Sequence, residues 1–113
     1  MTQASILTQV DPRGNATITL NRPDKANSYT LAMFNELADH IERWGRDPHI
    51  RAIVIRGAGK HFSAGAAIGE PSVVPNGGKL RDSYEICELI DHCPAPTIAL
   101  IQGACVGGGT AIA

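Results

Sequence analysis

The sequence lacks an excess of charge of either sign, and it lacks long hydrophobic runs. Ten lysine and arginine residues stand against eleven aspartate and glutamate residues, which gives a formal net charge of -1 and a pI near 6.4. No basic field is therefore available to attract nucleic acid or an anionic membrane. The longest apolar stretch, Thr97–Ile101, is far too short to span a bilayer. We expect neither nucleic acid nor a membrane as a partner.

The sequence also has little that marks a secreted or a metal-binding protein. Residues 1–10 lack the charged start and apolar core of a signal peptide. Three cysteines, an odd number without a CxxC pair, exclude a complete disulfide framework. The four histidines are scattered, and none lies four residues from another, as metal ligands on one helix do. These absences predict a reduced, cytoplasmic protein without a metal site.

What is present has the composition of a globular domain or of part of one. Of the 113 residues, 43% are hydrophobic and 19% are charged. Two runs with strand character, Ser5–Val10 and Ala16–Leu20, flank turn-forming residues at 11–15 and predict a β-hairpin. Two further apolar, β-branched runs, Ala52–Ile55 and Thr97–Gln102, suit buried strands.

Helical periodicity is strong between Thr30 and Trp44, where apolar residues recur at three- and four-residue steps. Ser28 or Thr30 is suited to cap the start of this helix, and Gly45 and Pro48 follow its end. The element order β-β-α-β-α-β-(α) then implies a largely parallel α/β sheet.

A second helix is predicted from Leu80 to Asp91. Its inward-facing residues are expected to be Tyr84, Cys87, Leu89 and Ile90. Gly107–Ala113 reads as the start of a further, buried helix with neither a polar cap nor a basic last turn. A helix of about five residues is not stable alone. We therefore expect that the sequence is truncated there, or that another part covers this end.

Two segments combine a short buried strand with a turn of glycine and other small residues. They are residues 60–68, KHFSAGAAI, and residues 102–110, QGACVGGGT. Ligands of α/β proteins collect outside the carboxyl ends of the strands, and small residues let a ligand approach the backbone closely. Two free amides that converge on one oxygen there form an oxyanion hole. Tight packing alone is the other reading of each segment.

Other motifs fit poorly. Gly103–Gly109 does not have the GxGxxG spacing, and no Lys-Ser/Thr pair follows it as in a P-loop. Ser63 is not in a GxSxG elbow and is interpreted as a turn residue. His61 and Glu70 are interpreted as loop residues, with contact to a phosphate and to an acyl pocket as the less favoured alternatives. Cys105 is interpreted as a small core residue.

Three segments carry a resemblance when they are taken together. Residues 21–28, NRPDKANS, look like the NRP…NA segment of the crotonase superfamily, also called the enoyl-CoA hydratase/isomerase family. Residues 62–68, FSAGAAI, are similar to its FSAGADI segment, and residues 96–109, PTIALIQGACVGGG, resemble its P-hydrophobic-G…GGG segment. The resemblance implies an α/β fold, the crotonase-like (ClpP/crotonase) spiral of ββα units. Residues 1–113 would be the N-terminal portion of a single such domain.

The resemblance also implies roles for individual residues. The backbone amides of Ala66 and Gly108 would form the oxyanion hole for the carbonyl of an acyl-CoA thioester. The other substrate-binding positions would be Lys25, Ala26, Ala64, Gly65, Ala67, Ile68, Val106, Gly107 and Ala111. No cofactor is implied beyond the coenzyme A of the substrate. Relatives of this kind assemble as homotrimers or hexamers, so self-association is expected of the full-length protein.

Two departures from the family pattern bear on the reaction. Ala111 stands where hydratases of this family usually carry a glutamate, and alanine cannot transfer a proton. Ala67 replaces the usual aspartate. The sequence predicts hydration or isomerisation of the acyl group and leaves hydrolysis and decarboxylation open. It also leaves open a non-catalytic paralogue or a subunit that needs a partner.

Overall fold

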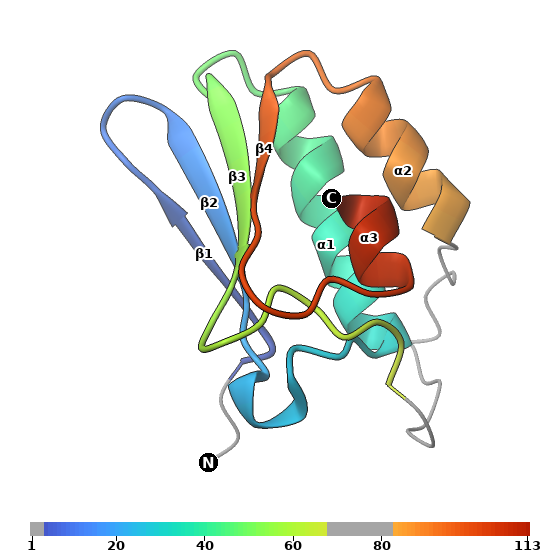
Figure 1. Ribbon diagram of the computed structural model, residues 1–113. Coiled ribbons are helices and arrows are strands. Elements are labelled where there is room, and N and C mark those ends of the chain that lie inside the picture. The colour runs from blue at the N-terminus through green and yellow to red at the C-terminus, as the bar shows by residue number, and fades with distance from the viewer. Residues whose placement is uncertain (1–3, 68–82) are drawn as a thin grey trace.

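The computed structural model describes residues 4–67 and 83–113. Its sheet has four strands in the order β1-β2-β3-β4. The strands are β1 (Ile6–Val10), β2 (Asn15–Leu20), β3 (Ala52–Gly57) and β4 (Thr97–Leu100). β1 is antiparallel to β2, whereas β2, β3 and β4 run parallel to one another, which confirms the largely parallel sheet. Figure 1 shows the helices gathered on one face of this sheet.

The predicted hairpin joins β1 to β2. The carboxylate of Asp11 accepts hydrogen bonds from the backbone N–H groups of Arg13 and Asn15, each at 2.9 Å. It also accepts one from the side-chain amide of Asn15 at 3.0 Å. These hydrogen bonds, chiefly those from Asn15, lower the pKa of Asp11. Gly14 completes the turn with a φ of 88°, a conformation that suits glycine.

The long helix α1 (Leu31–Gly45) confirms the strongest prediction from the sequence. The Thr30 side chain caps it by accepting a hydrogen bond from the Met33 N–H at 3.1 Å. The helix includes Gly45, and its C-cap residue Arg46 has right-handed backbone angles, so no left-handed glycine ends it. Its buried residues are Met33, Phe34, Leu37, Ala38, Ile41 and Trp44.

The core lies between α1 and the inner face of the sheet. Alternate residues of the central strands, Ala16 and Ile18 on β2 and Ile53 and Ile55 on β3, are buried there. The pairing register places Ala16 beside Ile53 and Ile18 beside Ile55, so these four side chains form one apolar layer that packs against α1. Burial of this layer is the main favourable term for the fold.

Two shorter helices complete the described part of the chain. The helix α2 (Ser83–Asp91) packs beside α1, and Leu80, the predicted start of this helix, lies outside the described residues. Among residues 85–91 of this helix, Ile86 is fully buried, which the sequence prediction missed, whereas Cys87, Leu89 and Ile90 are half-buried. The helix α3 (Gly108–Ile112) follows the second glycine-rich turn.

The strand ends also differ from the prediction. β3 continues to Gly57, two residues beyond Ile55, and β4 stops at Leu100. Gln102, the predicted last residue of this strand, lies beyond its end, and its side-chain amide donates to the carbonyl of Gly57 at 2.8 Å. No helix within residues 4–67 and 83–113 combines the length and the apolar character that a membrane crossing needs.

Candidate functional site

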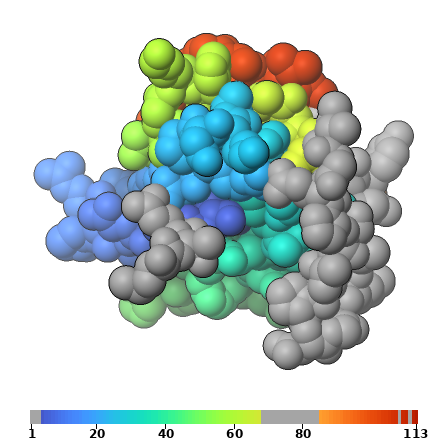
Figure 2. Space-filling model, turned by 90° about the horizontal axis from the view of Figure 1, so that it is seen from below, coloured from blue at the N-terminus to red at the C-terminus, as the bar shows by residue number. Residues whose placement is uncertain are grey.

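Three loops meet where the parallel strands end. Residues 21–29 follow β2 and include the short 3-10 helix η1 (Pro23–Lys25), residues 58–67 follow β3, and residues 101–107 follow β4. Isolated bridges join the loops in pairs, Tyr29 with Ala66 and Ser63 with Cys105. In Figure 2, which views the molecule from this end, the first loop (blue) lies beside the second (yellow-green), with the C-terminal segments (red) behind them. Both small-residue segments therefore belong to one site.

The bridge to Tyr29 decides how the Ala66 peptide is oriented. The Tyr29 N–H donates to the Gly65 carbonyl at 2.9 Å, and the Ala67 N–H donates to the Tyr29 carbonyl at 2.8 Å. In a parallel pair of this kind, the residue between those two groups directs its own N–H to the opposite edge. Ala66 is exposed, and its N–H donates to no residue of the described part of the chain. This amide is available to a ligand.

The second predicted amide, that of Gly108, lies at the start of α3. The N–H groups of Gly109 and Thr110 donate to the carbonyls of Val106 and Gly107, at 2.9 and 3.1 Å. Gly108 is the first residue of α3, and the first N–H groups of an α-helix have no partner within the helix. Such amides at a helix start carry partial positive charge.

The two segments that hold these amides are in direct backbone contact. The Ser63 N–H donates to the Ala104 carbonyl, and the Val106 N–H donates to the Ser63 carbonyl, both at 3.0 Å. A Cβ added to Gly65 would lie 3.0 Å from the Val106 carbonyl oxygen, and one added to Gly109 would lie 2.7 Å from that of Ser63. Glycine is therefore needed at both positions for the loops to approach this closely.

A buried asparagine, which the sequence prediction did not single out, holds the loops together. Asn27 is fully buried, and its Oδ1 accepts from the Arg22 N–H at 2.8 Å. Its Nδ2 donates to the carbonyls of Ala58 and His61, at 2.8 and 2.6 Å. The buried Ser63 Oγ donates to the Asn27 carbonyl at 2.9 Å, which gives this side chain a structural role. The motif match included Asn27, but nothing in its polar neighbourhood indicated burial.

His61 lies in the loop after β3 and also has a structural role. It is half-buried, and its Nδ1 lies 2.9 Å from the Ala104 N–H, which donates to it. The ring thus joins the loop after β3 to the loop after β4. None of its described contacts indicates a phosphate ligand.

The remaining predicted positions lie around these loops. Lys25 is exposed at the end of η1, and Ala26 follows it with a φ of 52° and accepts from the Ala64 N–H at 3.0 Å. Ala64 and Val106 are exposed, Ala67 is half-buried and Gly107 has a φ of 57°. Ala111 lies in α3, whereas Ile68 and Glu70 lie outside the described residues. Within the described ranges, no group of three acidic, histidine or cysteine side chains is placed to hold a metal ion.

Comparison with known proteins identifies the family. Residues 15–113 match the family Enoyl-CoA hydratase/isomerase. The chain belongs to the enoyl-CoA hydratase/isomerase family. This confirms the resemblance that the three sequence segments indicated.

Relatives in the family carry out different reactions, according to their names. The chain is 38% identical over 102 residues to 3-hydroxyisobutyryl-CoA hydrolase from Bos taurus, covering 84% of this chain and 26% of the relative. It is 40% identical over 101 residues to a probable enoyl-CoA hydratase from Mycobacterium tuberculosis, covering 87% and 40%. It is 35% identical over 106 residues to human Delta(3,5)-Delta(2,4)-dienoyl-CoA isomerase, covering 81% and 32%. The chain therefore spans less than half the length of these relatives.

Solved structures of the family share the fold. The crystal structure of an enoyl-CoA hydratase from Mycobacterium avium subsp. paratuberculosis matches with a TM-score of 0.80 at 32% identity. That match covers 96% of this chain and 41% of the other. A structure of an enoyl-CoA hydratase from Mycobacterium smegmatis matches with a TM-score of 0.83 at 28% identity, covering 97% and 44%. The predicted α/β, crotonase-like fold is confirmed.

Proposed function

We propose that this chain binds the carbonyl oxygen of an acyl-CoA thioester between the N–H groups of Ala66 and Gly108. The observation that carries this proposal is the available amide of Ala66, in a loop held in direct contact with the loop that leads to Gly108. Enolate or oxyanion formation places negative charge on the thioester oxygen. Preorganised N–H donors stabilise that charge, and each donor of this kind contributes about 3 kcal/mol to the transition state.

The rest of the acyl-CoA is assigned to the neighbouring residues. Lys25 and Ala26 are proposed to lie beside the nucleotide and pantetheine. The channel for the pantetheine and acyl group is assigned to Ala64, Gly65, Ala67, Ile68, Val106, Gly107 and Ala111. No cofactor is proposed beyond the coenzyme A of the substrate.

The proposed reaction of the whole protein is hydration or isomerisation of the acyl group. Ala111 carries no proton-transferring group, so the acid/base residue is assigned to a position outside these 113 residues. The similarity to 3-hydroxyisobutyryl-CoA hydrolase favours thioester hydrolysis as the second candidate, because the same oxyanion site serves that reaction. The whole protein is further proposed to be cytoplasmic and to assemble as a homotrimer or hexamer.

The test compares two ligands and two variants by calorimetry. Butyryl-CoA carries the thioester carbonyl, whereas its thioether analogue, S-butyl-CoA, lacks that oxygen. Gly108→Pro removes one N–H at the first helical position, where proline is tolerated, and Gly108→Ala retains the N–H as a matched control. One net hydrogen bond of about 1 kcal/mol predicts a roughly fivefold weaker affinity for butyryl-CoA in Gly108→Pro.

The affinity for S-butyl-CoA is expected to be equal in the two variants. Equal affinities of Gly108→Pro and Gly108→Ala for butyryl-CoA would contradict the role of this amide. Failure of the unmodified chain to bind either ligand would contradict the proposed function of these 113 residues.

A further inference from the structure

Tyr29 stands immediately before α1, and its ring is attached to that helix. It precedes the N-cap residue Thr30, whose side chain accepts from the Met33 N–H at 3.1 Å. The ring of Tyr29 stacks on that of Phe34, the fourth residue of α1, with ring centroids 4.3 Å apart and planes inclined by 8°. Contact between these two positions of a helix is a hydrophobic staple, which fixes the angle at which the chain enters the helix.

The core of the protein holds this staple in place. Phe34 is 3% exposed and belongs to the core between α1 and the sheet, and the half-buried Tyr29 packs against the same core. The Phe34 N–H donates to the Thr30 carbonyl at 3.1 Å, which closes the first turn of the helix. The packing of a side chain therefore fixes the place of the Tyr29 backbone relative to α1.

The backbone of Tyr29 in turn fixes the direction of the Ala66 N–H through one peptide plane. The Gly65 carbonyl and the Ala66 N–H belong to the same planar trans peptide unit and point in opposite directions. The Tyr29 N–H donates to that carbonyl at 2.9 Å, and the Tyr29 carbonyl accepts from the Ala67 N–H at 2.8 Å. Gly65 has a φ of 98°, and the conformational freedom of glycine means that this peptide unit needs an external restraint.

We infer that Tyr29 is a positioning residue of the thioester site, which keeps the Ala66 N–H directed at the ligand through its staple to Phe34. This inference rests on the proposed function, because it assigns the aim of the Ala66 amide and no contact between Tyr29 and the substrate. The ring carries the role, and the hydroxyl does not. Removal of the ring lets the Gly65–Ala66 peptide unit rotate, so it weakens binding of the thioester carbonyl and not binding of the rest of the ligand.

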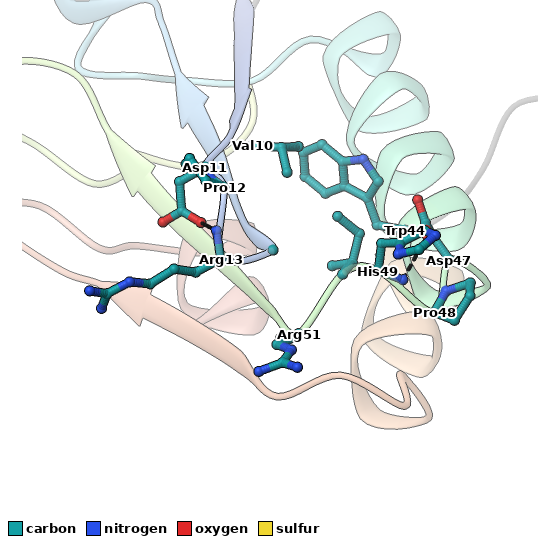
Figure 3. Close-up of a pocket in the computed structure, with 11 residues that line it drawn as sticks. Val10, Asp11, Pro12, Arg13, Trp44, Asp47, Pro48, His49 and Arg51 are labelled. Atoms are coloured by element: carbon teal, nitrogen blue, oxygen red, sulfur yellow. Dashed lines mark hydrogen bonds between the residues drawn. The ribbon is translucent and has the colours of Figure 1, made fainter.

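The opposite end of α1 offers a matched control. Trp44 lies in the last turn, ten residues after Phe34 and about 15 Å farther along the helix axis. Figure 3 shows Trp44 beside the pocket that the hairpin turn and residues 47–51 form. None of the residues proposed to bind the thioester lines that pocket. Trp44→Phe therefore weakens the packing of α1 without a change at the thioester site.

Hydrogen exchange measured by NMR tests the restraint without a ligand. The reporter is the Ala67 N–H, which donates to the Tyr29 carbonyl. Tyr29→Ala removes the ring and is expected to speed exchange of this amide about fivefold, as the loss of an aromatic pair predicts. Tyr29→Phe keeps the ring, and Trp44→Phe acts elsewhere on α1. Both are expected to leave the rate within about twofold, because loop amides exchange by local opening.

Calorimetry with butyryl-CoA and S-butyl-CoA tests the consequence for binding. The ratio of the two affinities reports the hydrogen bonds to the thioester oxygen. Tyr29→Ala is expected to lower this ratio about fivefold, which corresponds to one net hydrogen bond. Tyr29→Phe and Trp44→Phe are expected to keep the ratio of the unmodified chain. If Tyr29→Ala gives no dispersed NMR spectrum, Tyr29→Val replaces it, since valine retains part of the apolar side chain.

Two results would overturn the inference and leave the proposed function intact. One is an unchanged affinity ratio in folded Tyr29→Ala. The other is exchange of the Ala67 N–H that is equally fast in Tyr29→Ala and Trp44→Phe. A ratio near one in the unmodified chain would instead contradict the proposed function itself, and the inference with it.

Discussion

Replacement of Asn27 by alanine removes the side chain that joins the loop after β2 to the loop after β3 in the candidate site. The side chain makes three hydrogen bonds, one from the Arg22 N–H and two to the carbonyls of Ala58 and His61. It is fully buried, so water does not replace them. At about 1 kcal/mol net for each bond, their loss predicts about 3 kcal/mol of destabilisation.

The backbone at this position adds to the effect. Asn27 has a φ of 54°, in the left-handed region that asparagine tolerates and alanine does not. This adds about 1 kcal/mol, so the predicted loss for Asn27→Ala is about 4 kcal/mol in the free energy of unfolding. Asn27→Gly loses the same hydrogen bonds without the conformational penalty and is expected to cost about 3 kcal/mol.

Urea denaturation of the chain measures these differences, provided that the m-value does not change. Ala26→Gly is the control, because Ala26 has a similar φ of 52° and carries no side-chain hydrogen bond. It is expected to leave stability unchanged or raise it by up to about 1 kcal/mol. A loss below about 1.5 kcal/mol for Asn27→Ala would refute the reasoning, since the three buried bonds would then contribute almost nothing.

Three further outcomes are expected. Ser63→Ala removes a fully buried hydroxyl that bonds two backbone groups, so it should lower the free energy of unfolding by about 1–3 kcal/mol. Urea denaturation measures this loss, and an unchanged denaturation midpoint would contradict the bridging role of the hydroxyl. Gly103→Ala places a Cβ 2.2 Å from the Lys60 carbonyl oxygen, whereas the Cβ of Gly107→Ala would lie 3.9 Å from its nearest atom, at a similar φ. Gly103→Ala should therefore lower the free energy of unfolding by more than Gly107→Ala does. Equal losses in the two variants would contradict the clash and show that backbone strain alone is measured. The pKa of Asp11 is lowered in the folded state, so its stabilisation is present above the unfolded pKa and is lost as the pH falls through the folded pKa. Asp11→Asn should therefore flatten the acid side of the curve of stability against pH, and an unaltered curve would contradict this.

The elements that local sequence patterns encode were predicted correctly. The α1 helix follows from apolar residues at helical spacing and from the Thr30 cap, both of which lie within one short window. The hairpin follows from turn residues between two runs with strand character. The short helix α2 gave a weaker signal, and the burial of Ile86 in it was missed.

The support of the candidate site depends on contacts between residues far apart in the sequence, and these could not be predicted. The Asn27 side chain bonds the carbonyl of His61, 34 residues away, and His61 bonds the N–H of Ala104, 43 residues away. In the sequence each of these side chains stands in a polar loop and looks solvated. The small-residue loops were recognised, but the availability of the Ala66 amide depends on the hydrogen bonds that Tyr29 makes to Gly65 and Ala67.

The amide signals of Ala66 and Gly108 during titration with butyryl-CoA test the central claim most directly. If both N–H groups bind the thioester oxygen, both amide proton signals will shift downfield in a saturable manner, and S-butyl-CoA will not produce these shifts. Binding of butyryl-CoA that leaves both amide signals unchanged would contradict the claim, because the thioester carbonyl would then lie elsewhere.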